Sequence, residues 1–270
     1  MKELRGRRAL VTGASRGIGP HIARALALEG VHLAITARSG GLLEALASDL
    51  GSLRIHVASM RADLRAPDER AALIREATTR LGGLDILVNN AAIDSSGPFM
   101  DLEPQTITET IEVNLTAPMH LTALALPGMR QRGCGHVVNV ASLAGKKAMP
   151  YEALYGGTKA GLIEWTSALR IELRDTGVSL SAVCPGYVMG EGMFARWGVA
   201  PPWLFGRTTP ASVARAVVGA IRMDRAEVLV NSAPVRAWLA IYAVAPGLAA
   251  RMVDLLGLRN FQRTKVGARD

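Results

Sequence analysis

The sequence predicts an α/β protein built on one doubly wound, mostly parallel Rossmann-type sheet of about seven strands. Short apolar runs alternate with longer amphipathic runs from the start of the chain almost to residue 232. Strands separated by helical stretches need crossover connections, which place parallel strands side by side with helices on both faces. A glycine-rich turn follows the first apolar run. Sheets of this kind bind ligands at the carboxyl ends of their strands.

Each apolar run has the length of a buried strand and is bounded by turn residues. The expected strands lie within residues 8–13, 31–38, 54–64, 84–92, 135–142, 178–186 and 226–231. The expected helices lie within residues 20–30, 40–51, 67–82, 106–129, 150–177 and 209–223. Pro67 falls in the first turn of its helix, and Gly82 and Gly177 follow helix ends, which are the positions that these residue types favour.

Composition limits the classes of protein that fit. The chain of 270 residues is 49% hydrophobic, which suits one large domain, and we see neither a signal-peptide pattern nor an apolar stretch long enough to span a membrane. Cys134 and Cys184 share no CxxC or metal-binding spacing, and the five histidines form no HxxxH pattern. We therefore expect buried free thiols, a cytoplasmic location and no metal site.

The formal net charge of +8 is concentrated near the end of the chain. Residues 196–270 hold 11 Lys and Arg but only four Asp and Glu. A basic tail can serve nucleic acid, an anionic membrane surface or solubility. The sequence has no nucleic-acid-binding signature, and its aromatic residues do not alternate with basic ones as on a stacking platform. We expect no nucleic-acid partner.

The turn TGASRGIG, residues 12–19, joins the first expected strand to the first expected helix. Its glycines at 13, 17 and 19 permit positive φ angles and a close approach to a ligand. The helix that follows presents its free N–H groups to a pyrophosphate. A tight strand–helix turn is the plainer interpretation of the glycines alone. The strand before and the helix after them are the context that a dinucleotide site requires.

The end of the second expected strand bears on the choice between NAD and NADP. NAD sites usually place an acidic residue there to hold the ribose 2′-OH. This strand ends ITARSG, with Arg38 and no acid, and Arg16 lies in the glycine turn. Two guanidinium groups suit a 2′-phosphate, whereas a solvated Arg38 at the strand end is the alternative. We predict that NADP(H) is preferred over NAD(H).

Two tyrosines, Tyr151 and Tyr155, lie four residues apart, and only Tyr155 has a lysine four residues further on, Lys159. Residues i and i+4 share a helix face. A nearby cation favours the phenolate and lowers the tyrosine pKa from its ordinary value of about 10. Ser142 ends a strand at the ligand-binding edge, where its hydroxyl could hold a substrate oxygen while Tyr155 gives or takes a proton.

The motifs TGASRGIG, NNAA, VNL, Ser142, YGGTK and PG occur in the order and spacing of the classical short-chain dehydrogenases/reductases. The chain resembles this family over about residues 5–232. The resemblance implies hydride transfer between a nicotinamide cofactor and a carbonyl or alcohol carbon. It also implies a catalytic tetrad of Asn114, Ser142, Tyr155 and Lys159. In that tetrad Tyr155 is the general acid–base, Lys159 binds the nicotinamide ribose and lowers the tyrosine pKa, and Asn114 holds a water and interrupts its helix.

The glycine turn and the resemblance together define the expected cofactor site. Its residues are Gly13, Ser15, Arg16, Gly17, Ile18, Gly19, Arg38, Asp63, Leu64, Asn90, Ala91, Tyr155, Lys159, Pro185, Gly186 and Val188. Two positions depart from the family pattern. Ala92 replaces the last glycine of NNAG, and Gly190 replaces a threonine expected to hold the nicotinamide carboxamide. The second change leaves that anchor to be supplied in another way.

The stretch at about residues 190–209 corresponds to the substrate loop of the family. It contains four of the twelve aromatic residues of the chain. We expect a cap over an apolar substrate, with ordinary loop packing as the alternative. The expected substrate residues are Ser142, Tyr151, Tyr155, Phe194 and Trp197.

Residues 233–270 extend beyond the catalytic domain, which we place at residues 1–232. The extension reads as two short apolar helices broken at Pro246–Gly247, flanked by arginines. Such a pair suits contact with a membrane surface, a subunit interface or a second wall of the substrate pocket. We also expect a homodimer or homotetramer.

The sequence thus predicts an NADP(H)-dependent oxidoreductase acting on an apolar carbonyl or alcohol, such as a 3-oxoacyl chain, a steroid, a retinoid or a bulky ketone. Two alternatives stay open. One is an NAD-linked alcohol dehydrogenase. The other is a catalytically idle NADP(H)-binding sensor or scaffold, against which the set of Ser142, Tyr155 and Lys159 argues.

Overall fold

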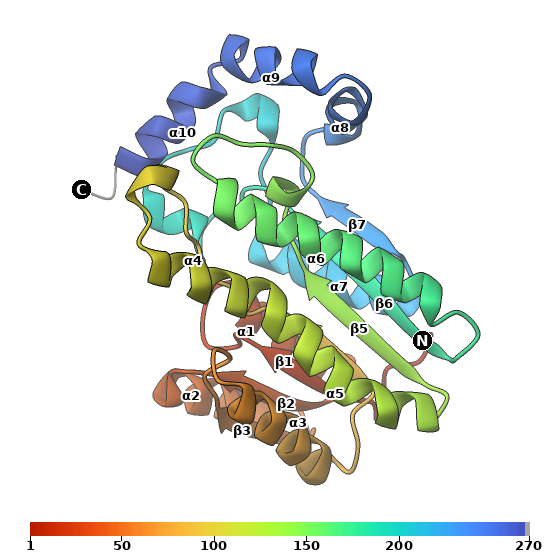
Figure 1. Ribbon diagram of the computed structural model, residues 1–270. Coiled ribbons are helices and arrows are strands. Elements are labelled where there is room, and N and C mark those ends of the chain that lie inside the picture. Colours follow the sequence, from red (N-terminus) through yellow and green to blue (C-terminus); the bar gives the residue numbers. More distant parts are fainter. Residues whose placement is uncertain (268–270) are drawn as a thin grey trace.

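A computed structural model describes residues 1–267 as one seven-stranded parallel sheet with helices on both faces (Figure 1). The strands are β1 Arg8–Thr12, β2 His32–Ala37, β3 Val57–Arg61, β4 Ile86–Asn89, β5 Gly135–Val140, β6 Val178–Pro185 and β7 Glu227–Val230. The helices are α1 Ile18–Leu28, α2 Gly40–Gly51, α3 Pro67–Leu81, α4 Pro104–Ile111, α5 Ala117–Gln131, α6 Ala153–Glu172, α7 Pro210–Met223, α8 Val235–Val244, α9 Pro246–Leu255 and α10 Leu258–Gly267. Short 3₁₀ turns occupy Phe99–Asp101, Leu143–Gly145, Phe194–Trp197 and Trp203–Phe205.

The strand order is β3-β2-β1-β4-β5-β6-β7, which confirms the predicted doubly wound sheet. The order reverses between β1 and β4, and such a switch point leaves a crevice at the carboxyl ends of the strands. Strands β4 and β5 are buried throughout because both faces of the sheet are covered.

Two hydrophobic layers hold the helices to the sheet. One layer contains Ile22 and Leu26 of α1 together with Val213 and Val217 of α7, and the other contains Leu73 of α3 with side chains of α5. Each fully buried leucine or isoleucine contributes about 1.5–3 kcal/mol relative to an exposed one. The edge that carries the ligand site is therefore fixed by a large and rigid core.

The long helix expected at residues 106–129 is one continuous helical run with a change of winding. It consists of α4, a π-helical segment at Glu112–Thr116 and α5. The π segment contains Asn114, at the position where the family resemblance implied an interrupted helix. Such bulges within α-helices are frequent at functional sites.

Two predictions about helix positions were wrong. Helix α6 begins at Ala153, three residues later than expected, because Tyr151 has a left-handed φ of +62° and its carbonyl oxygen accepts a hydrogen bond from the Gly97 N–H. The C-terminal extension contains the expected pair of helices, α8 and α9, divided at Pro246, and a third helix that was not expected. The third helix, α10, was not predicted because it lacks an apolar stripe. Its buried face includes the polar residues Gln262 and Lys265 beside Leu258. The final three residues of the predicted extension lie outside the described residues.

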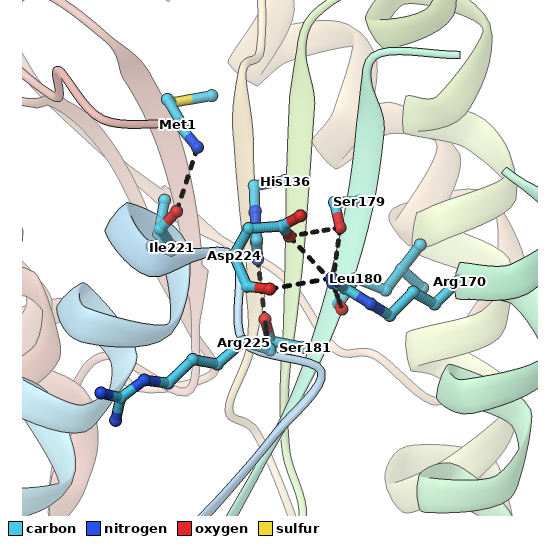
Figure 2. Close-up of polar contacts among 9 residues, drawn as sticks. All are labelled: Met1, His136, Arg170, Ser179, Leu180, Ser181, Ile221, Asp224 and Arg225. Carbon is cyan, nitrogen blue, oxygen red and sulfur yellow. Dashed lines mark hydrogen bonds and ion pairs between the residues drawn. The ribbon is translucent and has the colours of Figure 1, made fainter. Parts of the chain in front are cut away.

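A polar network ties the amino ends of β5 and β6 to the end of α7 (Figure 2). The hydroxyl group of Ser181 donates to the Arg225 carbonyl oxygen, so it must accept from the Nε2–H group of His136, which lies 2.8 Å away. Arg170 donates to Leu180 and to both the carbonyl and the carboxylate of Asp224. Burial lowers the pKa of His136 to about 4, so its imidazole is neutral near pH 7.

Within residues 1–267, no helix is both long and apolar enough to cross a membrane. Cys134 and Cys184 are free thiols, as predicted. Cys184 is buried as expected, but Cys134 is partly exposed, so the prediction that both are buried was wrong for Cys134.

Candidate active site

The turn between β1 and α1 forms one end of a cavity of about 560 Å³. A Cβ atom on Gly19 would lie 2.1 Å from the carbonyl oxygen of Gly13, so only glycine lets α1 begin this close to the turn. Gly17, with a φ of +63°, is the N-cap of α1 and has no side chain to occupy the first N–H groups of the helix. These groups and the positive end of the helix dipole fit the pyrophosphate of a dinucleotide.

Asn90, the residue just after β4, supports the glycine turn. Its side-chain Nδ2 donates to the carbonyl oxygens of Thr12, at 2.9 Å, and Gly13, at 3.2 Å. The Thr12 hydroxyl accepts from the backbone N–H groups of Asn90 and Ala91. Residues 90 and 91 line the cavity, and the Asn90 side chain supports the turn.

Basic groups lie at the same end of the cavity as the glycine turn, within that turn and just after β2. Arg16 and Arg38 both line the cavity, and neither forms an ion pair with any of residues 1–267. Asp63 also lines it, but the carboxylate of Asp63 is bound by Arg65, with an Nη2–Oδ2 distance of 2.6 Å. That hydrogen bond, with a smaller effect from the charge of Arg38, lowers the pKa of Asp63. Two guanidinium groups are thus left to meet an anionic part of a ligand.

Ser142, Tyr155 and Lys159 meet at the other end of the cavity, beyond the end of β5. Ser142 lies two residues after β5, and its Oγ accepts from the Ala144 N–H at 3.1 Å. Lys159 lies one turn after Tyr155 on α6, and its Nζ donates to the Val140 carbonyl oxygen at 2.9 Å. The Nζ atom lies 5.8 Å from the centre of the Tyr155 ring.

Two glycines allow the serine turn and α6 to approach this closely. A Cβ atom on Gly145 would lie 2.6 Å from the backbone nitrogen of Ala160, and one on Gly156 would lie 2.9 Å from the carbonyl oxygen of Ala144. The glycine within α6 thus has a packing role that offsets its cost of about 1 kcal/mol in a helix.

The electrostatics of Tyr155 differ from the expectation that Lys159 lowers its pKa. Burial raises the pKa of Tyr155 well above its ordinary value, the charge of Asp94 raises it further, and a hydrogen bond with Ser142 lowers it in part. Burial also lowers the pKa of Lys159 to about 8. Desolvation is the largest effect on the Tyr155 pKa, so Tyr155 carries its proton at neutral pH.

Asn114 lies behind this group rather than in the cavity. Its Oδ1 accepts from the Ile93 N–H at 2.7 Å, and its Nδ2 donates to the Ile93 carbonyl oxygen and to Thr158 Oγ1. Thr158 in turn donates to the Tyr155 carbonyl oxygen at 2.8 Å. Asn114 therefore connects β4's loop to the turn of α6 that carries Tyr155.

Aromatic and charged side chains surround the cavity next to Tyr155. Phe194 and Trp197 are buried and line it, and Trp197 Nε1 donates to Asp94 Oδ2 at 3.1 Å. Phe205 also lines it, whereas Trp203 is 88% exposed. The chain therefore uses only part of the expected aromatic cap.

The C-terminal helix α10 belongs to the extension for which a second wall of the substrate pocket was one expectation, and it contributes Lys265 to the cavity lining. Lys265 Nζ lies 2.7 Å from Glu152 Oε1, and it is 5.0 Å from the centre of a Trp197 ring. Gln262 donates to the same Glu152 oxygen at 3.1 Å and contacts the Tyr187 hydroxyl at 3.3 Å. Lys265, Glu152, Lys147 and Asp94 all line the cavity and lack a sequence motif that could have revealed them.

Most residues expected in the site share this one cavity. Those that line it are Gly13, Ser15, Arg16, Gly17, Ile18, Arg38, Asp63, Leu64, Asn90, Ala91, Ser142, Tyr155, Lys159, Pro185, Gly186, Val188, Phe194 and Trp197. Gly19 and Asn114 act from behind it. Among the described residues that form its lining, Tyr151 is not present, so the structure does not support its assignment to the substrate site.

A dinucleotide-binding crevice that ends at a serine, a tyrosine and a lysine defines a Rossmann-type oxidoreductase. The sequence profile of the family described as short chain dehydrogenase matches residues 7–197. The chain belongs to this family, and a nicotinamide cofactor is typical of it.

Similar proteins include the ketoacyl reductase HetN of a Nostoc species, 40% identical, with 98% of this chain and 94% of that protein covered. A putative ketoacyl reductase of Streptomyces coelicolor is 34% identical over 94% of this chain and 97% of its own. A solved metagenomic short-chain oxidoreductase in complex with NADP is 33% identical, with a TM-score of 0.72 over 84% of this chain and 98% of its own.

Proposed function

We propose that this protein reduces the carbonyl group of a largely apolar substrate of the 3-oxoacyl type, with NADPH as the preferred cofactor. The observation that carries this proposal is the convergence of Ser142, Tyr155 and Lys159 at the aromatic end of the dinucleotide crevice. The similarity to two proteins named as ketoacyl reductases favours a 3-oxoacyl substrate over a steroid, a retinoid or another bulky ketone.

A bound nicotinamide cofactor would supply the hydride, and the protein supplies position and a proton. The Ser142 hydroxyl holds the substrate carbonyl oxygen, and Tyr155 donates its phenolic proton to that oxygen. The raised pKa keeps the Tyr155 phenol protonated at neutral pH but weakens it as an acid, so efficient proton transfer requires that the bound cofactor and substrate bring this pKa closer to the working pH. An ammonium has three N–H bonds, so Lys159 can bind ribose hydroxyl groups while one N–H stays on the Val140 carbonyl oxygen.

The preference for NADP(H) rests on charge. Arg16 and Arg38 line the cavity without an ion-pair partner in the described chain, and β2 ends without an acid. A 2′-phosphate would satisfy both guanidinium groups. The complex of a similar protein with NADP is consistent with this choice.

The C-terminal extension has two proposed roles. Lys265 supports the interpretation of α10 as a second wall of the substrate pocket. Exposed Val244, Leu248 and Leu255 beside the exposed Arg251 support a further contact of α8 and α9, with a second subunit or an anionic membrane surface. Sedimentation of the purified protein alone and with anionic vesicles separates a homo-oligomer from a peripheral membrane protein.

The proposed function is tested by following NADPH oxidation against a panel of aldehydes, ketones, 3-oxoacyl thioesters and steroids. We expect the largest kcat/KM with 3-oxoacyl thioesters and a clear preference for NADPH over NADH. Tight binding of NADPH with no turnover across the whole panel would contradict the proposal and favour a sensor.

A further inference from the structure

Two adjacent lysines after the serine turn have opposite environments. Lys146 forms an ion pair with Glu227 of β7, with an Nζ–Oε2 distance of 2.8 Å, and does not belong to the cavity lining. Lys147 lines the cavity together with Ser142 and Tyr155. Its ammonium lies 5.2 Å from the centre of the Phe205 ring. Of these two neighbouring cations, only Lys147 lines the cavity, at the end that holds Ser142 and Tyr155.

The ammonium of Lys147 has no counter-ion of its own among residues 1–267. Glu152 is near enough for its charge to act on Lys147, but the Oε1 atom of Glu152 is already bound by Lys265 and Gln262. Contact with an aromatic ring compensates a partly desolvated ammonium only in part. Three N–H donors at the wall of a substrate cavity are a site for an oxyanion.

We propose that Lys147 binds an anionic oxygen group of the substrate while Ser142 and Tyr155 hold its carbonyl. This inference rests on the proposed carbonyl reduction and narrows its substrate class to molecules with a carboxylate or a phosphate beyond the carbonyl. The apolar part of such a substrate packs against Phe194, Trp197 and Phe205. A 3-oxo acid offers its carboxylate, and a 3-oxoacyl phosphopantetheine offers its phosphate.

The test compares two pairs of substrates that differ only in the anionic group. The first pair is acetoacetate and methyl acetoacetate, and the second is S-acetoacetyl-4′-phosphopantetheine and S-acetoacetyl-pantetheine. We expect Lys147→Met to raise KM for the anionic member of one pair by about 10- to 100-fold, the effect of losing one charge-assisted hydrogen bond. The KM of the neutral member and the kcat of both should change by less than about threefold, and the pair that responds identifies carboxylate or phosphate as the anion.

Matched variants separate binding from a structural effect. Lys147→Arg should restore most of the affinity, and Lys146→Met, which removes the neighbouring charge outside the cavity, should leave both pairs unchanged. Calorimetric titration of the NADPH complex with 3-hydroxybutyrate and its methyl ester, which the reduced cofactor cannot oxidise, gives a readout that does not depend on turnover.

The inference is overturned if Lys147→Met weakens both members of each pair equally, or if it weakens neither. Failure of the proposed function looks different. In that case the unmodified protein reduces none of the four compounds, while the calorimetric comparison still reports whether Lys147 distinguishes the acid from the ester.

Discussion

The Nζ atom of Lys265 lies 2.7 Å from the Oε1 atom of Glu152, and both side chains are almost completely buried. The pair joins the last described helix, α10, to the residue just before α6, so the C-terminal extension is held against α6. Removing one partner of a buried pair leaves an uncompensated charge. The contact therefore couples the position of α10 to the substrate end of the cavity.

We predict that Lys265→Met lowers the free energy of unfolding by about 3 kcal/mol, because it leaves the buried Glu152 carboxylate without its counter-ion. The double variant Glu152→Gln, Lys265→Met should lose about 1–3 kcal/mol less than the sum of the two single variants. Urea unfolding of the four proteins measures this coupling. The partly exposed pair of Lys146 and Glu227 is the control, and Lys146→Met should cost less than about 1 kcal/mol. Additive losses would show that the two side chains do not interact.

The two tyrosines of the YEALY stretch should respond differently to loss of the hydroxyl. Tyr155→Phe removes the proton donor in the cavity and should lower kcat by about 10²- to 10⁴-fold, with NADPH affinity retained. Tyr151→Phe, at a position outside the cavity lining, should change kcat by less than about twofold. Steady-state kinetics and NADPH fluorescence titration measure both effects. A large loss in Tyr151→Phe with normal turnover in Tyr155→Phe would refute the assignment.

Cofactor choice should depend on Arg38. Replacing it with aspartate removes a guanidinium from a 2′-phosphate and supplies the acid that NAD sites use on the ribose. We expect Arg38→Asp to raise the Kd of NADPH by about 10- to 100-fold and to leave the Kd of NADH unchanged or lower. Arg75→Asp on α3, an exposed arginine outside the cavity lining, makes the same charge change and should affect neither cofactor. An equal loss of affinity for NADPH and NADH would show that Arg38 does not act through the 2′-phosphate.

The sheet, the glycine turn and the catalytic group were predictable because each depends on local signals. The apolar runs have strand length, and Gly13, Gly17 and Gly19 meet a backbone requirement that no other residue satisfies. Tyr155 and Lys159 are one helical turn apart, so sequence spacing alone places them together.

The charged half of the substrate site could not be predicted in this way. Glu152 and Lys265 lie 113 residues apart and meet only through the packing of α10. Lys147 is distinguished from Lys146 only by the direction in which the backbone turns after Ser142. The pKa of Tyr155 is raised chiefly by burial, which sequence spacing does not reveal.

Stability should fall in mild acid because of His136. Its pKa is about 4 in the folded protein and 6.5 when unperturbed, so the unfolded chain binds more protons between these values. The contribution of the neutral His136 to the free energy of unfolding has its full value above pH 6.5 and is lost as the pH falls toward 4. Between pH 7.5 and pH 5 the free energy of unfolding should therefore fall by about 2 kcal/mol. Asp85 and Asp224, whose pKa values are lowered, lose their contributions to stability only below about pH 3.8, so they do not affect the comparison between pH 7.5 and pH 5.

Urea unfolding at these two pH values measures the effect. The difference in free energy of unfolding should be smaller in His136→Gln, whose side chain can still donate to Ser181, than in the unmodified protein (Figure 2). His56→Gln, at an exposed position, should retain the full difference. An unchanged pH dependence in His136→Gln would mean that the buried imidazole does not control acid stability.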